Sequence, residues 1–347
     1  MKKGLLYVIV GLVVASLLAG CGGASKPAQQ QQPAQQPAQK APEQIVIKVA
    51  YVVPETQSSH IAAVDFKKYV EEKSGGRIKV ELYPNGQLGS DRQAIEAVSL
   101  GTIQMTIPAV AVLSGFEKSF MVLDLPFLFK DRQAAYKALD GELGRKLAEK
   151  LPAIGLKSLA FAENGFRNIT NNRGPITEPK DLKGLKIRTM ENPVHMETFR
   201  QLGANPTPMA FGELYTALQQ KTVDAQENPV SLIYTTKFYE VQKYCTLSGH
   251  VYAATALLIN NDFFNKLPAD LQKILQDAAI LYRDNQRKLA LQQDTEWVAK
   301  LKEAGMKVNE LTPEQKQKFI EATKPVYEKF KAQLGADLVE LALKANQ

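Results

Sequence analysis

The residue of this sequence best suited to bind an anion is an arginine that closes a short apolar segment. Arg188 ends the stretch Leu185-Lys186-Ile187-Arg188. A guanidinium stays charged and presents a planar fork of N–H donors, which meets a carboxylate in two parallel hydrogen bonds. Packing alone would rarely place an arginine at the end of an apolar strand. The sequence therefore predicts carboxylate binding at Arg188, with a surface ion pair to Glu191 as the alternative.

Residues for metal or nucleophilic chemistry are sparse. His60, His195 and His250 have no Glu or Cys at metal-ligand spacing, and no Gly-x-Ser-x-Gly motif is present. We therefore expect no catalytic residue, no metal and no cofactor, although paired acids of a hydrolase would leave no recognisable spacing. His60 falls in the first turn of a predicted helix, where helix N-termini attract anions, which makes it a candidate for the binding cleft.

The N-terminal segment has the layout of a secretory signal. Lys2 and Lys3 precede an apolar run, which ends in Leu18-Ala19-Gly20-Cys21. The cysteine after small residues resembles a bacterial lipobox, so residues 1–21 are predicted to be a lipoprotein signal peptide and Cys21 the lipidated residue. The alternative, a single transmembrane anchor, is disfavoured because the run is at or below the ~17–25 residues that cross a bilayer. We expect an extracytoplasmic, lipid-anchored protein, in a periplasm or on the outer face of the cytoplasmic membrane.

The next segment, residues 22–44, is rich in Gln, Pro and Ala and is predicted to be a disordered tether. The rest has the composition of a globular protein, with 45% hydrophobic and 23% charged residues over the whole chain. The net charge of +7 is spread among acidic residues, without a basic block or zinc-finger spacing. Nucleic acid is therefore not expected as a partner.

Strand and helix patterns alternate after residue 44, which predicts an α/β fold with two modules and a binding crevice at the carboxyl ends of the strands. Predicted strands cover 45–53, 78–83, 103–107, 157–162, 185–189 and 243–247. Predicted helices cover 58–74, 91–100, 194–202, 211–220, 268–304 and a last segment from 312. The helix over 268–304 would be about 55 Å long, which is long enough to brace both modules.

Several segments in series resemble the solute-binding proteins of tripartite ATP-independent periplasmic (TRAP) transporters, and most of all their dicarboxylate-binding DctP branch. The segments are Tyr83–Gly89, Gly165–Thr170, Asp181–Arg188, Leu202–Met209, Glu213–Gln219, Val223–Pro229 and Lys237–Tyr244. The resemblance implies a two-lobed periplasmic-binding-protein-like fold with a cleft between the lobes. It implies a first lobe of about 45–164 and 253–292, and a second of about 165–252 and 293–347.

The resemblance also implies a function. The protein would capture an organic acid anion by closing its lobes and deliver it, as a monomer, to a permease with a small and a large membrane subunit. A C4-dicarboxylate such as malate, succinate or fumarate is the expected ligand, and a sugar acid (a uronate or aldonate) is the alternative. Outside transport, the competing hypotheses are an extracellular enzyme and a sensory protein that presents a ligand.

The family's ligand contacts carry over onto particular residues. The arginine that pairs with the substrate carboxylate matches Arg188. Arg167 matches a second arginine, which would bind a second carboxylate or a hydroxyl, or would order the hinge. Asn228 matches the site asparagine, Phe211 an aromatic lining of the cleft, and Tyr215 a weaker candidate one helical turn further on.

The chain departs from the family pattern in the first lobe. Sialic-acid binders carry polar side chains at the positions of Val52 and Ala109. These apolar side chains cannot hydrogen-bond a polyol, so sialic acid is not expected as the ligand.

Overall fold

The computed structural model describes residues 44–347. The predicted signal peptide with Cys21, and the tether up to residue 43, lie outside the described residues. Between residues 44 and 347, no helix is both long enough and apolar enough to span a bilayer.

The first of two sheets has five strands in the order β2-β1-β3-β10-β4. They are β1 (Ile45–Ala50), β2 (Ile78–Tyr83), β3 (Met105–Thr106), β4 (Leu156–Phe166) and β10 (Tyr252–Asn260). β1 runs parallel to β2 and β3, whereas β10 is antiparallel to β3 and β4. β3 is shorter than the strand predicted over 103–107. We call this sheet and its helices the first lobe.

The second sheet has six strands in the order β11-β9-β5-β8-β6-β7. They are β5 (Asn168–Asn171), β6 (Lys186–Thr189), β7 (Asn205–Pro208), β8 (Ala225–Asn228), β9 (Tyr244–Leu247) and β11 (Lys307–Glu310). β6 lies between β7 and β8 and is parallel to both. We call this sheet and its helices the second lobe. Two sheets in a mixed α/β fold agree with the predicted fold class.

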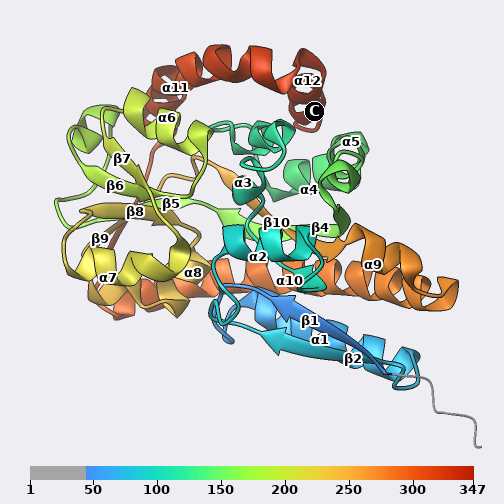
Figure 1. The fold of residues 1–347 in the computed structure, drawn as a ribbon. Coiled ribbons are helices and arrows are strands. Elements are labelled where there is room, and N and C mark those ends of the chain that lie inside the picture. Colours follow the sequence, from blue (N-terminus) through green and yellow to red (C-terminus); the bar gives the residue numbers. More distant parts are fainter. Residues whose placement is uncertain (1–43) are drawn as a thin grey trace, which may run out of the picture. The chain divides into compact units, whose positions relative to one another are not determined.

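The helices cover both sheets (Figure 1). In the first lobe they are α1 (Ser58–Lys73), α2 (Asp91–Ser99), α3 (Val110–Leu113), α4 (Arg132–Asp140), α5 (Glu142–Ala148) and α9 (Asn261–Lys266). In the second they are α6 (Pro193–Gln201), α7 (Leu214–Gln219) and α8 (Val230–Thr235). Short 3-10 turns include η1 (Lys118–Asp124) and η4 (Phe211–Glu213), the latter occupying the start of the helix predicted over 211–220.

The long helix predicted from the sequence is confirmed. α10 (Ala269–Glu303) has 35 residues, which corresponds to about 52 Å. Its first half packs on α1 and β4, and its second half packs on α8 and β11 (Figure 1). Leu275 and Ala278 join the apolar core of the first lobe, and Trp297 and Leu301 join that of the second. The helix therefore ties the two lobes together, because it contributes apolar side chains to the core of each.

The C-terminal helices do not stay with the second lobe. α11 (Pro313–Leu334) contributes Phe319 to a second-lobe core but Val326 to a first-lobe core. α12 (Ala336–Lys344) packs Leu338 and Ala342 into that same first-lobe core. The lobe boundaries given by the resemblance place 293–347 wholly in the second lobe, and the packing of α12 departs from them because its apolar stripe faces η1, α4 and α5. The remaining boundaries stay a prediction.

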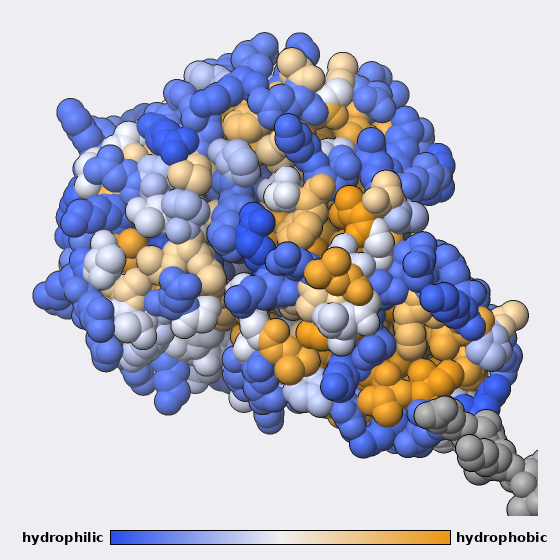
Figure 2. Space-filling model, viewed as in Figure 1, coloured by the Kyte–Doolittle hydropathy of each residue, from blue (hydrophilic) through white to orange (hydrophobic). Residues whose placement is uncertain are grey.

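The exposed side chains of the two lobes differ in hydropathy on the face shown in Figure 2. On the face shown in Figure 2, apolar side chains gather over the end of the first sheet formed by β1 and β2. Val46 on β1 is 37% exposed. The second-lobe elements on the same face are mostly hydrophilic.

Gly165 sits where β4 leaves the first lobe. Its φ of +124° is a conformation that side chains rarely adopt, and a Cβ there would lie 2.9 Å from Pro229 Cβ and 3.0 Å from Asp294 Oδ2. Gly165→Ala is expected to lower the free energy of unfolding by ~1–3 kcal/mol, measured by urea denaturation. Gly174→Ala is the control, since a Cβ at Gly174 meets no atom within 4 Å. Equal stability of the two variants would contradict this prediction.

Candidate functional site

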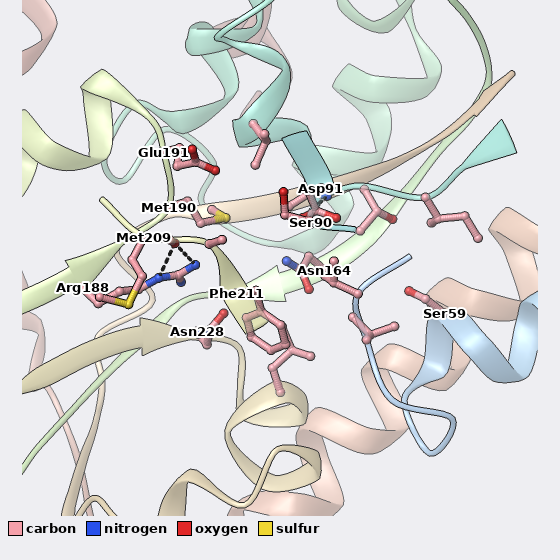
Figure 3. Close-up of a pocket in the computed structure, with 18 residues that line it drawn as sticks. Ser59, Ser90, Asp91, Asn164, Arg188, Met190, Glu191, Met209, Phe211 and Asn228 are labelled. Atoms are coloured by element: carbon pink, nitrogen blue, oxygen red, sulfur yellow. Dashed lines mark hydrogen bonds between the residues drawn. The ribbon is translucent and has the colours of Figure 1, made fainter. Parts of the chain in front are cut away.

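A pocket between the two lobes is the candidate site, and elements of both sheets line it (Figure 3). It encloses about 590 Å³, its solvent-open mouth included. The first lobe contributes Val52, Val53, Ser59, Ser90, Asp91, Ile107, Ala109, Val112, Asn164 and Thr255. The second lobe contributes Arg188, Met190, Glu191, Met209, Ala210, Phe211, Asn228 and Leu232. Pockets between two packed units are usual binding places for small organic molecules.

Arg188 is held in the pocket wall by its strand and by one carbonyl. It lies on β6, between two parallel neighbours, and its Nε and Nη2 donate to Met209 O at 3.0 and 2.7 Å. Its Nη1 is buried and has no hydrogen-bond partner among residues 44–347. Burial, and then the charge of Arg167, lower the pKa of Arg188 to about 10, so the side chain remains a cation at neutral pH. A fixed cation with a free donor is suited to an anion.

The alternative given by the sequence, an ion pair between Arg188 and Glu191, is not what the structure contains. Glu191 Oε1 accepts from Arg92 Nε at 3.2 Å. Arg92 lies on α2, so this ion pair joins the two lobes at the rim of the pocket. Asn192 adds further links across the lobes, because its Nδ2 donates to Ala111 O at 2.9 Å and to Asp124 Oδ2 at 2.8 Å.

Arg167 is buried behind the pocket and is not among the residues that line it. Its guanidinium pairs with the carboxylate of Glu227, and its Nη2 also donates to Asn228 Oδ1 at 3.1 Å. Its backbone N–H donates to Val251 O at 2.8 Å, at the point where the chain returns to the first lobe. Arg167 therefore connects the segments that pass between the lobes.

Glu227 collects charge-assisted hydrogen bonds in this buried network. Burial would raise its pKa, but the charge of Arg167 and the hydrogen bonds from His250 and Arg167 hold the pKa of Glu227 far below its usual range. Burial lowers the pKa of His250, which is consistent with a neutral ring whose Nε2 donates to Glu227 Oε2 at 3.2 Å. Ser248 Oγ lies 2.8 Å from His250 Nδ1. In a neutral ring that carries its proton on Nε2, Nδ1 accepts the hydrogen bond from this hydroxyl.

Two further residues predicted from the resemblance do line the pocket. Asn228 ends β8, and its Nδ2 donates to Gln226 Oε1 at 2.5 Å, which orients the amide. Phe211 presents its ring to the cavity (Figure 3), and its other side packs edge-to-face on Phe238, with centroids 6.2 Å apart.

Tyr215 and His60 lie elsewhere. The Tyr215 hydroxyl donates to Glu240 Oε2 at 2.8 Å on the surface of the second lobe. His60 is in the first turn of α1, as predicted, but its Nδ1 lies 2.8 Å from the Tyr51 hydroxyl. Burial lowers the pKa of His60, which favours the neutral ring. Neither residue lines the pocket.

Sequence reasoning missed the acidic and amide groups of the first lobe. Asp91 and Asn164 face the pocket from the side opposite Arg188 (Figure 3). Burial raises the pKa of Asp91 to about 7; the Ala109 N–H and the charge of Arg188 only partly oppose this. The available signal was the predicted helix start at Asp91, just beyond the carboxyl end of β2, where α/β sheets bind ligands.

Within residues 44–347, no group of three or more His, Cys, Asp or Glu is placed to hold a metal ion.

Comparison with known proteins identifies the family. Residues 49–333 match the family model of DctP, described as bacterial extracellular solute-binding protein, family 7. The 2,3-diketo-L-gulonate-binding periplasmic protein YiaO of Escherichia coli is 40% identical over 262 residues, which are 76% of this chain and 80% of that protein.

Two solved structures share the fold. The sugar acid binding protein DctPAm of Advenella mimigardefordensis, in complex with galactonate, superposes with a TM-score of 0.85 at 41% identity, over 87% of this chain and 98% of that one. A TRAP periplasmic solute-binding protein of Shewanella oneidensis, with bound succinate, superposes with a TM-score of 0.85 at 33% identity, over 88% of this chain and 100% of that one. Together with the two-lobed fold and the cleft arginine, these matches show that the chain belongs to the DctP family and is an extracytoplasmic TRAP solute-binding protein for organic acids.

Proposed function

We propose that the ligand of this protein is a hydroxylated monocarboxylate of the sugar-acid class, which docks its carboxylate on Arg188. The observation that carries this proposal is the charge of the pocket wall. Among the described residues that line the pocket, Arg188 is the single cation, and two acidic side chains, Asp91 and Glu191, accompany it. The pocket wall therefore offers a cation to one carboxylate of a ligand, and no second cation to a second carboxylate.

Neutral hydrogen-bonding groups fill much of the remaining polar wall. Ser59, Ser90, Asn164, Asn228 and Thr255 all line the pocket. Hydroxyls and amides both donate and accept, which suits the hydroxyl groups of a sugar acid. Apolar Val52 and Ala109 border them, so the polar contacts lie on a limited part of the wall.

A C4-dicarboxylate, the ligand favoured by the sequence, is the second candidate. The succinate-bound relative supports a dicarboxylate ligand, and the galactonate-bound relative supports a sugar acid. The position of Arg167 weighs against the dicarboxylate. The second arginine, which a second carboxylate would require, lies outside the pocket wall and is paired with Glu227. A distinct enzymatic role is not favoured, because the family consists of solute-binding transport proteins.

The physiological setting follows from the family and from the N-terminal motif. The loaded protein would present its ligand to a TRAP permease of small and large membrane subunits, acting as a monomer. Cys21 would carry a lipid that anchors the chain, and residues 22–44 would form the tether. The ligand would favour the closed arrangement, since it touches both lobes there, and the Arg92–Glu191 ion pair would form at closure.

Isothermal titration calorimetry tests the ligand class. The protein is first unfolded and refolded to remove any bound ligand, and is then titrated with D-galactonate, L-gulonate, succinate and L-malate. We expect a sugar acid to bind at least about tenfold more tightly than either dicarboxylate, a difference of ~1.4 kcal/mol. Galactitol, a neutral polyol, is the control and should not bind. Tighter binding of succinate or malate would contradict the proposed ligand class and favour the second candidate.

A further inference from the structure

Asp91 is placed in the pocket by the start of α2. Ser90 caps this helix through a reciprocal pair of hydrogen bonds with Gln93, which fixes the backbone at Asp91. The side chain faces the pocket from the first lobe, with Arg188 on the opposite side (Figure 3). Its Oδ2 accepts from Ala109 N at 3.4 Å, whereas its Oδ1 is buried and has no hydrogen-bond partner among residues 44–347.

An ionised carboxylate only accepts hydrogen bonds, and a buried oxygen without a donor carries a desolvation cost. A ligand hydroxyl placed at Oδ1 would remove that cost by donating to it. A ligand carboxylate placed there would bring two acceptor groups of like charge together, which is unfavourable. The carboxyl group of Asp91 therefore favours the binding of a sugar acid and disfavours the binding of a dicarboxylate.

The charged neighbours of Asp91 do not cancel its repulsion of a second ligand carboxylate. Arg188 faces it from β6, and its charge would be shared with the first ligand carboxylate. Glu191, which follows β6, adds a like charge. Arg92, the next residue on α2, is paired with Glu191 and lies over the Phe116 ring, 5.5 Å from its centroid.

We propose that Asp91 is the specificity-determining residue of the pocket, which accepts a hydrogen bond from a ligand hydroxyl and repels the second carboxylate of a dicarboxylate. This inference rests on the proposed function, in which the first carboxylate docks on Arg188. It adds the residue that sets the choice between ligand classes.

The test compares Asp91→Asn with the wild-type protein in titrations with D-galactonate and succinate from about pH 6 to about pH 8. In the wild type, the affinity for succinate should fall as pH rises through about 7, because Asp91 ionises there. The affinity for galactonate should hold or rise, because the ionised form accepts the hydroxyl. In Asp91→Asn, succinate should bind at least about tenfold more tightly than to wild type at about pH 8, without the pH dependence, and galactonate should bind more weakly.

Two further variants separate this role from a structural one. Asp91→Glu keeps the charge but moves it, so it should weaken galactonate binding without a gain for succinate. Glu72→Gln removes one negative charge from the exposed face of α1 and should leave the ratio of the two affinities unchanged. Asp91→Glu also keeps the inference testable if Asp91→Asn does not fold.

The outcomes are distinguishable. If Asp91→Asn and Asp91→Glu fold and keep the wild-type ratio of galactonate to succinate affinity, the role of Asp91 is overturned and the proposed ligand class stands. If the wild type itself binds succinate more tightly at about pH 8, the proposed ligand class fails, and this inference fails with it before any variant is made.

Discussion

Arg188→Ala is expected to remove most of the affinity for the acid and to leave the fold intact. Truncating one partner of a buried charge pair typically costs ~2–5 kcal/mol, which corresponds to a loss of affinity of about 30-fold to several thousand-fold. The reason is that Arg188 is the single cation among the described pocket-lining residues. Titration calorimetry with the tightest-binding acid of the panel measures the loss.

Two variants define the origin of this effect. Arg188→Lys keeps the charge but cannot hold Met209 O through two N–H groups while presenting a third to the ligand, so it should recover only part of the affinity. Arg200→Ala, at an exposed position on α6, is the control and should bind like the wild type. Wild-type affinity in Arg188→Ala would show that the acid docks elsewhere.

Glu227→Ala is expected to have the largest effect on stability. It would leave the Arg167 guanidinium buried without its counter-ion, and both side chains of this pair have no exposed surface. Removing one partner of a buried ion pair destabilises a protein by ~3–5 kcal/mol. Urea denaturation measures the change in the free energy of unfolding. Glu149→Ala, which breaks the exposed pair with Arg145, is the control, with an expected cost of at most ~1 kcal/mol.

The Arg167–Glu227 pair should also make the free energy of unfolding depend on pH under acidic conditions. Because the folded-state pKa of Glu227 lies below its ordinary value of 4.5, its contribution to stability is complete above about that pH and declines as the pH falls further. Glu227→Gln should therefore lose less stability on acidification than the wild type does. If Glu227→Ala cost no more than Glu149→Ala at neutral pH, the Arg167–Glu227 pair would not be a structural element of the hinge.

Side-chain chemistry pointed to Arg188, because a cation at the end of an apolar strand has few structural uses, and the structure places this side chain in the pocket wall. Arg167 could not be resolved in the same way. Its partner Glu227 is 60 residues away in sequence, and only the antiparallel pairing of β5 with β8 brings the two together. The sequence left a ligand contact and a hinge role open for Arg167, and its pairing with Glu227 supports the hinge role.

His60 and Tyr215 show the limit of local patterns. Helix α1 begins at Ser58, close to the predicted start, so His60 does lie in a first helical turn. A helical position fixes the direction of a side chain only relative to its own helix, however, and here the imidazole meets Tyr51 instead of the pocket. Tyr215 likewise follows Phe211 by about one turn but points to Glu240 on the surface.

The sequence by itself determined the fold class, the long helix α10 and the family, because alternating strand and helix patterns and motifs in series are properties of neighbouring residues. It also singled out Arg188, the one cation among the described residues that line the pocket. Only the tertiary structure decided what surrounds that cation. Asp91 and Arg188 are nearly a hundred residues apart and belong to different lobes, so no local pattern could show that they share one pocket. The physical reason is that burial and electrostatic interaction depend on distances in space, which the packing of the two lobes on α10 sets.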